Sequence, residues 1–570
     1  NDSVIYTPIV IDSNHAFTKV DGVLFKQMLK MLSLDFICNY DSLILKDTKK
    51  INKLAFALDM AVAGRSDESV WIRQAQEIRK QMTDSLIDSA FTYLPEGVKH
   101  DEIELIKRKL KRRRLELEAV ASQYYRLLQR TPVVAGTNQS DYFLIERQAP
   151  DRTILRIYDP ETGDCRLEQQ FSGKETKELW LYGLAGNDTF EVKGNTRKDF
   201  PIYLISGEGE NQYQLNHNRK IHVYDKDYKY DYQKIKYHKI SFTPWGIYDS
   251  DKGISLGTFF TYTMYGFKRA PFTYQHRIGY NYLKGFMYAG VFPNYDGRRR
   301  LYLNASISSP RNFENFFGFG NNTAGYKEEK KNYNRVKLRT YMFNPSFEMD
   351  LRKEEVMTFF GSLDMYKAKR TDDRYIYTVY GEDHPIFRTN YFVGLGATYR
   401  ITKQPYSWLP LLETEWTAGW KMNLKKPERN FPYAQGSLSW NVRFSDRFTW
   451  ASLMKGTVLF DNDYEFYQAA TIDLRGFRDN RFIGKQSFYQ YSDLRLDMGK
   501  LKNPFTPLKY GLFAGFDYGR VWFPGERSHS WHTSYGGGIW LTFLNKFTTK
   551  YSWFGSTDSF RFAFELGLGF

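Results

Sequence analysis

Long apolar runs are missing from this sequence. No stretch of 18 or more apolar residues occurs, so no segment is typical of a helix that crosses a lipid bilayer. Cysteine is also scarce, and Cys38 and Cys165 allow one disulfide without requiring it. The two cysteines and nine histidines show no zinc-ligand spacing. The sequence therefore predicts no metal site.

Aromatic residues, in contrast, are abundant. The chain of 570 residues has 43 Tyr, 45 Phe and 12 Trp, which together make 18%, yet its mean hydropathy is −0.57. Many aromatics with low mean hydropathy indicate strands in which every second residue is polar. A membrane β-barrel has this composition, because its strands alternate between lipid and lumen. A soluble β-rich protein has it too, so composition alone leaves both classes open.

The charge balance is basic. Lys and Arg number 81 against 65 Asp and Glu, a formal charge of +16. Such a balance suits nucleic acid or an anionic membrane surface. No Lys/Arg tract accompanies a recognisable nucleic-acid module, and the densest run, "KRKLKRRR" at 107–114, lies on a predicted helix. A solvated helix face is the simpler interpretation of that run, and nucleic acid is not an expected partner.

The N-terminal part, residues 1–130, is predicted to be mainly helical. Two segments within 66–129 carry apolar residues at helical spacing, and the Pro95-Glu96-Gly97 break separates them. Their frequent charges exclude a lipid span. We therefore expect two antiparallel helices outside the membrane.

A small β-rich domain is predicted for residues 131–237. The segments "LYGLAGNDTFEV" and "LISGEGENQYQL" resemble each other, with Gly186 and Gly209 at equivalent places 23 positions apart. A glycine followed by polar residues and an aromatic fits the turn of a stacked parallel β-structure. Calcium-binding β-rolls have similar turns, but they need several consecutive repeats. Two separated copies favour plain turns without an ion.

From about residue 238 to residue 570 the sequence alternates with period two. In the last segment, "FRFAFELGLGF", the residues at 560, 562, 564, 566, 568 and 570 are apolar or aromatic, and the intervening ones are polar or small. This alternation suits a strand between lipid and a polar lumen. About sixteen such strands are expected, at 238–248, 252–266, 271–284, 286–296, 299–309, 335–351, 355–369, 388–402, 409–425, 430–446, 447–460, 487–501, 508–523, 531–544, 546–554 and 559–570.

One loop between these strands is unusually basic. "DLRGFRDNRFIGKQ" at 473–486 places three arginines close together, with Gly476 beside Arg475. Asp493 and Asp517 lie on the faces of the next two strands that we assign to the lumen. If the loop folds inward, Arg475 can meet both acids, and Gly476 would permit the sharp turn that aims the guanidinium. A flexible surface loop that binds anionic lipopolysaccharide is the alternative.

Several stretches resemble one family. "DLRGFRDNRF" is similar to the Arg-Gly-Phe/Tyr motif in the sixth extracellular loop of the BamA/TamA superfamily, the bacterial surface antigen barrels. "YSDLRL", "GFDYGRVW" and "ISFTPWGIYDSDKGISLG" resemble two later strands and the first hairpin of that family. The resemblance implies that Arg475, Gly476 and Phe477 form the loop motif and that Asp493 and Asp517 are its partners in the wall. Asp493 stands where the family usually has Glu, which shortens its reach.

The same resemblance gives a role to the end of the chain. Phe570 fits the terminal aromatic residue that serves outer-membrane barrels as an assembly signal. Gly567 and Gly569 would weaken a seam between the first and last strands, because glycine leaves backbone unsupported by side-chain packing. Such a seam would open laterally to pass protein or lipid.

Upstream, "TPIVIDSNHAFTKVDG" resembles the connecting region of a subgroup in which a metallophosphoesterase or kinase-like module precedes the barrel. A two-metal phosphoesterase needs several Asp, His and Asn clusters to hold its ions and activate water. Asp12 and His15 are at most a remnant of such a cluster, and a structural role is the simpler interpretation. Gly253-Ile254-Ser255-Leu256-Gly257 lies within a predicted strand rather than on a nucleophile elbow. No catalytic site and no cofactor are predicted.

Together these observations predict a mainly β protein of the bacterial outer membrane. Residues 238–570 would form an antiparallel transmembrane barrel of about sixteen strands, and residues 1–130 and 131–237 would be periplasmic. The expected function is outer-membrane protein or lipid assembly or translocation. The alternatives are a passive channel, a structural subunit of a surface complex, and a membrane anchor for a phosphoesterase encoded upstream of Asn1. The expected partners are outer-membrane lipid, lipopolysaccharide, and proteins of the periplasm or outer membrane.

Overall fold

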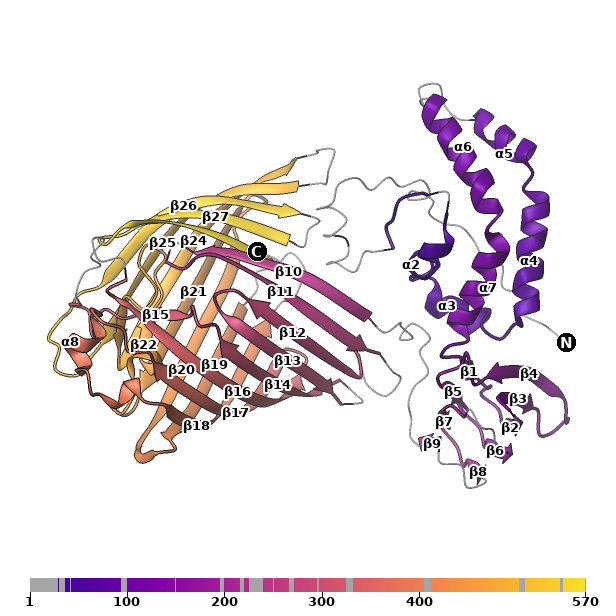
Figure 1. Ribbon diagram of the computed structural model, residues 1–570, viewed down its shortest axis with the longest axis horizontal. Coiled ribbons are helices and arrows are strands. Elements are labelled where there is room, and N and C mark those ends of the chain that lie inside the picture. Colours follow the sequence, from indigo (N-terminus) through magenta and orange to yellow (C-terminus); the bar gives the residue numbers. More distant parts are fainter. Residues whose placement is uncertain are drawn as a thin grey trace. The chain divides into compact units, whose positions relative to one another are not determined.

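The computed structural model divides into two compact units, Asn1–Tyr237 and His238–Phe570 (Figure 1). Each unit is described by itself. The structure describes residues 29, 36–41, 43–93, 100–148, 150–194, 199–215, 220–224, 239–249, 251–265, 271–294, 297–323, 332–403, 412–501, 508–543 and 547–568. Asp12, His15, Gly569 and Phe570 of the sequence analysis lie outside these residues.

The first unit begins with helices. Its described helices are α2 (Thr48–Ile51), α3 (Phe56–Val62), α4 (Glu68–Gln81), α5 (Asp84–Ala90), α6 (His100–Arg114) and α7 (Leu117–Leu128). Each of the two predicted helices is therefore split in two. The first breaks at Thr83, whose side chain accepts a hydrogen bond from the Leu86 N–H and so caps α5. None of the described helices is long and apolar enough to cross a bilayer.

The basic run at 107–114 is held by its own unit. Lys111 of α6 forms an ion pair with Asp88 of α5 at 2.8 Å, and the Arg113 guanidinium stacks on the Tyr40 ring at 4.3 Å. On the other pair of helices, Trp71 of α4 meets Tyr124 of α7 edge to face at 5.8 Å. These contacts join α4 to α7 and α5 to α6, which is the antiparallel arrangement expected for residues 66–129.

The small β domain is a short parallel solenoid with one hairpin inserted. Its strands are β1 (Val133–Ala135), β2 (Tyr142–Gln148), β3 (Arg152–Tyr158), β4 (Cys165–Ser172), β5 (Leu179–Tyr182), β6 (Thr189–Gly194), β7 (Ile202–Ile205), β8 (Gln212–Leu215) and β9 (Ile221–Tyr224). One sheet has the order β1-β5-β7-β9 and the other the order β4-β3-β2-β6-β8. The two segments that resemble each other in sequence are successive coils, so the predicted stacked parallel structure is confirmed.

The turns of the solenoid stack on one another through side chains. The backbone N–H of Asp141 donates to the Asp188 carboxylate at 2.8 Å, and the N–H of Asp188 donates to the Asn211 side-chain oxygen at 2.9 Å. Beside this ladder the rings of Phe143 and Phe190 stack at 4.5 Å. The polar residues of each turn thus satisfy the backbone of its neighbour.

The second unit is a closed antiparallel barrel. Its wall contains sixteen strands among the described residues: β10 (Lys239–Asp249), β11 (Gly253–Met264), β12 (Tyr274–Asn281), β13 (Gly285–Pro293), β14 (Arg299–Ser308), β16 (Arg335–Arg352), β17 (Glu355–Ala368), β18 (Asn390–Lys403), β19 (Leu412–Asn423), β20 (Lys426–Arg443), β21 (Phe448–Leu459), β24 (Gln486–Leu501), β25 (Leu508–Trp522), β26 (His532–Phe543), β27 (Phe547–Gly555) and β28 (Phe560–Leu568).

Each predicted strand matches one strand of this wall. The largest difference in a strand's start is at β20, which begins at Lys426 rather than at residue 430. The loops hold further short elements that the sequence did not predict: β15 (Phe313–Asn315), α8 (Ile376–Tyr380), β22 (Ala470–Ile472) and β23 (Phe482–Gly484). They gather at the end of the barrel that carries α8 in Figure 1, called the loop end below.

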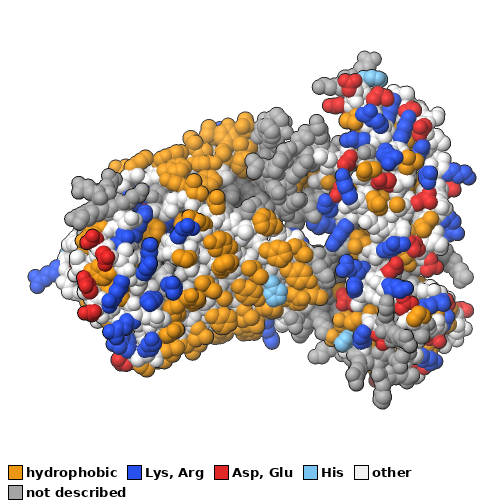
Figure 2. Space-filling model, in the orientation of Figure 1, with side chains coloured by type: hydrophobic (Ala, Val, Ile, Leu, Met, Phe, Trp, Pro, Cys, Tyr) orange, Lys and Arg blue, Asp and Glu red, His pale blue; other side chains and the backbone are white. Residues whose placement is uncertain are grey.

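The two faces of the wall differ as the alternation predicts. In β25, Phe516 is 48% exposed while Asp517, the next residue, is fully buried. Figure 2 shows a broad band of hydrophobic side chains on the visible side of the barrel. In β28, the rings of Phe562 and Phe564 contact Trp553 and Tyr551 of β27.

We expect adjacent residues of one strand to differ sharply in their tolerance of charge. Leu438 and Ser439 follow each other in β20, and Ser439 lines a cavity in the lumen. Leu438→Arg should lower the free energy of unfolding by about 2–4 kcal/mol if the site lies near the bilayer midplane, whereas Ser439→Arg should have a much smaller effect. Urea unfolding of the two variants in bilayers measures the difference. Equal losses would contradict the assigned faces.

A second expectation concerns Asp188 in the solenoid. Its carboxylate is fully buried and one oxygen has no hydrogen-bond partner among the described residues. Burial raises its pKa to about 7, and the nearby Asp141 contributes. Since its ordinary pKa is about 3.9, the folded state holds a proton that the unfolded chain releases between about pH 4 and pH 7. The stability of this domain should therefore fall as pH rises through that range.

Asp188→Asn should remove this pH dependence, because the amide carries no charge and Asn211 already fills the equivalent place in the next coil. At pH 8 the variant should be more stable by about 1–3 kcal/mol, the usual penalty of a buried unsatisfied group. Hydrogen exchange of the β2 and β6 amides in the full chain, corrected for intrinsic rates, measures this. Faster exchange in the variant at pH 8 would overturn the expectation.

Candidate functional site: the arginine loop and the barrel seam

The loop between β21 and β24, residues 460–485, is called the arginine loop below. Its residues Ile472, Leu474, Phe477 and Phe482 are buried and pack with Tyr489 and Val521 of the wall. The loop contains the short hairpin of β22 and β23. It therefore lies folded inside the barrel rather than outside it.

The arginine that the sequence singled out meets both predicted acids. Arg475 Nη1 lies 2.7 Å from Asp493 Oδ1, its Nε donates to both oxygens of Asp517 at 3.0 Å, and its Nη2 also reaches Asp517. The backbone N–H of Arg475 adds a further bond to Asp517 at 3.1 Å. The guanidinium stacks on the Phe554 ring at 3.9 Å. A forked, charge-assisted and mostly buried arrangement of this kind is both strong and directional.

Asp493 reaches Arg475 although it is shorter than the glutamate usual in the resembled family. The close approach depends on Gly515, where a Cβ atom would stand 2.7 Å from Arg475 Nη2 and 2.7 Å from the Asp493 carboxylate. Asp493 also lies 3.6 Å from Arg495 and 3.9 Å from Lys550. It is thus the shared anion of a cationic cluster in the lumen.

Gly476 has a different role from the one expected. Its backbone is not in the left-handed region, so glycine is not required there for a sharp turn. Instead a Cβ atom would stand 2.7 Å from Ser534 Cβ and 2.9 Å from the Gly555 carbonyl oxygen. The Gly476 carbonyl accepts a hydrogen bond from Ser556 at 2.7 Å. Glycine therefore permits the loop to lie against the wall, and Phe477 beside it is buried among aromatic rings.

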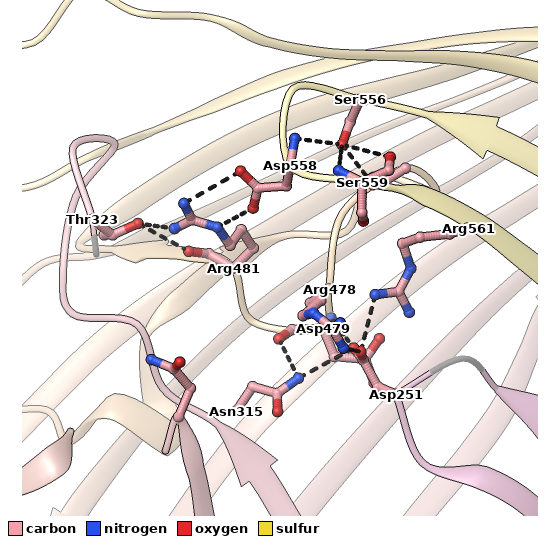
Figure 3. A network of polar contacts seen from close by, with 12 residues as sticks. Asp251, Asn315, Thr323, Arg478, Asp479, Arg481, Ser556, Asp558, Ser559 and Arg561 are labelled. Carbon is pink, nitrogen blue, oxygen red and sulfur yellow. Dashed lines mark hydrogen bonds and ion pairs between the residues drawn. The ribbon is translucent and has the colours of Figure 1, made fainter. Parts of the chain in front are cut away.

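A second cluster, which the sequence analysis missed, is centred on Asp251 (Figure 3). This aspartate lies in the turn between β10 and β11, and its side chain is fully buried. It forms ion pairs with Arg478 of the arginine loop and, at 3.0 Å, with Arg561 of β28. It also accepts hydrogen bonds from the Asp479 N–H at 2.9 Å and from the Asn315 side chain at 3.2 Å. One carboxylate thus joins the first hairpin, the last strand and the loop.

Arg481 extends this network around the loop end. It pairs with Asp558 in the turn between β27 and β28 and donates to Thr323 (Figure 3). The third arginine of the quoted motif is therefore as engaged as the first two. Asp251, Arg478, Arg481, Asp558 and Arg561 together are called the seam clasp below.

The clasp lies where the wall is weakest. Among the described residues, β10 and β28 pair at Tyr248 and Phe564 alone. The neighbouring pair is continuous, since β27 and β28 match from Phe547–Leu568 to Gly555–Phe560. Gly567 belongs to that second ladder, opposite Thr548. At the junction of the first and last strands, ion pairs between side chains therefore replace many of the contacts that backbone hydrogen bonds make elsewhere in the wall.

Beneath the loop lies a polar cavity in the lumen of about 490 Å³. Its lining includes both signs of charge, from Arg475, Asp493, Lys550, Arg561 and Glu565. Glu565 thus faces inward as the alternation requires. The arrangement holds these charges in pairs, with Arg475 on Asp493 and Asp517.

The remaining sequence candidates have structural roles. Ser255, the serine of the chance Gly-x-Ser-x-Gly match, donates to the Asn281 side chain at 2.6 Å within the β11–β12 region. Cys165 is an exposed thiol without a disulfide. The helix that carries 107–114 uses its cations within its own unit.

Comparison with known proteins gave matches among solved structures only. No family model and no curated protein matches the chain. BamA from Haemophilus ducreyi lacking POTRA domains 1–3 matches with 12% identity and a TM-score of 0.44, over 58% of this chain and 71% of that one. CdiB from Escherichia coli matches with 11% identity and a TM-score of 0.39, over 58% and 67%. CdiB from Acinetobacter baumannii gives 12% and 0.36, over 59% and 66%.

We expect Arg475→Ala to destabilise the barrel strongly. It would leave the fully buried Asp517 with Ser534 and one backbone N–H but without its cation. Breaking a buried pair in this way costs about 3–5 kcal/mol, most of it from the remaining charge. Thermal unfolding in detergent measures the loss. As a control, Arg443→Ala removes an exposed pair with Asp446 and should change stability by less than about 1 kcal/mol.

The double variant Arg475→Ala with Asp517→Asn tests the cause. Because it removes the orphaned charge, it should recover part of the lost stability relative to Arg475→Ala alone. No recovery would mean that the loss comes from packing of the guanidinium against Phe554.

Proposed function

We propose that this chain is an outer-membrane barrel that assembles or translocates protein or lipid by opening between its first and last strands. The observation that carries the proposal is the seam, where β10 and β28 pair at Tyr248 and Phe564 alone among the described residues. In lipid an unpaired backbone group costs several kcal/mol, so a wall with a poorly paired junction separates there first. The outward band of apolar side chains supports the membrane location.

The proposed orientation follows from the loops. The long loops and the arginine loop lie at one end of the barrel, and short turns such as Lys353-Glu354 join the strands at the other. Bacterial barrels place short turns in the periplasm and long loops outside the cell. In this orientation the first unit, which precedes β10, is periplasmic and available to partner proteins of the periplasm or outer membrane.

The arginine loop would set the opening of the seam. Arg475 anchors it to β24 and β25, away from the seam, while Arg478 and Arg481 hold Asp251 and Asp558 beside the seam. Movement of the loop would therefore release the first hairpin and the β27–β28 turn together. A coupled release of this kind is what a gated wall needs.

A passive channel is less well supported. At the loop end a cluster of buried side chains closes over the lumen, including Phe316, Phe387, Phe466 and Ile483. Loop 309–323 joins it to the far wall, since Asn321 accepts and donates hydrogen bonds with Val521 of β25. An open pore would need a water-filled path through this region.

The proposal is tested by closing the seam with a disulfide. Tyr248→Cys with Phe564→Cys, in a chain whose Cys38 and Cys165 are replaced by serine, places two thiols at the one paired position of the seam. Oxidation should abolish complementation of a strain that lacks the native gene, and a reductant should restore it. Growth and the abundance of outer-membrane proteins and lipopolysaccharide are the readouts.

A matched pair away from the seam is the control. Tyr288→Cys with Ala305→Cys joins β13 to β14, where the strands are fully paired. Its oxidation should leave complementation intact, because that junction does not open. Full activity of the oxidised seam variant would exclude lateral opening as the mechanism.

A further inference from the structure

A groove lies on the outside of the wall, near the loop end of β12 to β14, β16 and β17. Its volume is about 1090 Å³. Its apolar part consists of outward side chains that are 41–58% exposed: Tyr280, Phe286, Ile307 and Tyr341. In a barrel that spans a membrane, this part faces acyl chains.

The upper part of the groove is cationic. Strand β16 places Arg339 and Lys337 on the same outward face as Tyr341, toward the loop end, and β17 continues this face with Lys367. Figure 2 shows Lys and Arg side chains gathered at this end of the barrel, next to the hydrophobic band. The cations that line the groove are Lys337, Arg339, Lys367, Lys369, Arg370 and Arg388, and no Asp or Glu lines it among the described residues.

Arg370 lies 3.6 Å from the exposed Asp383, but the cations at the centre of the groove lack the acids that balance others in the same wall. Arg339 stands directly opposite Lys367 in the β16–β17 ladder, and like charges at such positions are destabilising. Within the described part of the chain, neither forms an ion pair. On the inner face of β17 the opposite holds, since the buried Asp364 pairs with Lys421 of β19 at 2.7 Å. The outward cluster is thus suited to an anion that the protein does not supply.

We propose that this groove is a binding site for a phosphorylated glycolipid of the outer leaflet, the chemical class of lipopolysaccharide. The inference rests on the outer-membrane location proposed above. Two features select this ligand over a simple anion. The cations match phosphate groups, which arginine can bind through two parallel hydrogen bonds, and the aromatic floor directly below them matches acyl chains. A soluble anion would use only the first feature.

The groove lies away from the seam, and this position suggests how a bound glycolipid would contribute to the proposed function. It lies on β12 to β17, so the wall around it does not include the β10–β28 seam. A glycolipid held there would fix this half of the barrel in the outer leaflet while the seam opens. We therefore expect substitutions of the groove cations to lower the affinity for the glycolipid. They should leave the contacts of the arginine loop with Asp493 and Asp517 unchanged.

The test uses the full chain in detergent, titrated with purified lipopolysaccharide and with the same glycolipid after enzymatic removal of its phosphates. The variant is Arg339→Gln with Lys367→Gln. The control, Lys353→Gln with Lys403→Gln, removes two exposed cations from the opposite end of the wall, in the β16–β17 turn and at the end of β18. Wild type should prefer the phosphorylated form at least tenfold. The variant should lose about tenfold or more in affinity, and the control should not, since each cation near an anionic lipid surface contributes about a factor of five.

Two further measurements decide the source of the phosphate and the dependence on the proposed function. Inorganic phosphate at equal phosphate concentration should not displace the glycolipid. Displacement would mean that the groove binds any phosphate and does not select the glycolipid. Equal affinity for both glycolipid forms, or an equal loss in the control, would overturn the inference. Membrane fractionation separates the two proposals: a chain found in the outer membrane without lipid preference refutes only the groove, and a chain absent from that membrane refutes both.

Discussion

The carboxylate of Asp251 lies beside the junction of the first and last strands, where the described part of the wall has the fewest backbone pairs. A barrel in lipid must pair the backbone of its first strand with that of its last, because no water is present to replace a missing partner. Here that junction has a single paired position among the described residues, Tyr248 with Phe564. Asp251 holds Arg561 of the last strand from the turn of the first hairpin, and Arg478 brings the arginine loop to the same point. The closure of the wall and the position of the loop therefore depend on one buried anion.

The two ends of the loop contribute in different ways. Arg475 is fixed by two acids and an aromatic ring on β24, β25 and β27, where the strands are fully paired. Arg478 and Arg481 are fixed by turns that adjoin the seam. Separating a buried ion pair is costly when one charge stays buried without its partner. We therefore expect the loop to keep or release these contacts together. If the seam opens as proposed, the joint release of these contacts would give it two states rather than a continuous range.

Much of the barrel could be predicted from period-two alternation, because a wall between lipid and lumen imposes that alternation on every strand. Arg475 with Asp493 and Asp517 could be predicted for a related reason, since the acids stand out on the lumenal faces of strands close to the loop in sequence. Asp251 and Arg561 are 310 positions apart and carry no local signal. They could have been found only by applying closure itself, which makes the first and last strands neighbours and brings an acid of the first hairpin to an arginine on the polar face of the last strand.

The misread glycine shows the limit of local reasoning. Gly476 next to an arginine in a loop suggests a turn, because glycine is the residue that turns most often need. Its actual constraint is space: a Cβ atom would stand 2.7 Å from Ser534 Cβ and 2.9 Å from the Gly555 carbonyl oxygen. Both residues belong to strands that the loop meets only after it has folded inward. The helices of the first unit show the same limit. The apolar pattern continues through Thr83, but the Thr83 side chain caps α5 and so divides the first predicted helix in two. Periodicity specifies which face of an element is buried. Where elements end, and how closely they approach, depends on single side chains whose partners the fold brings together.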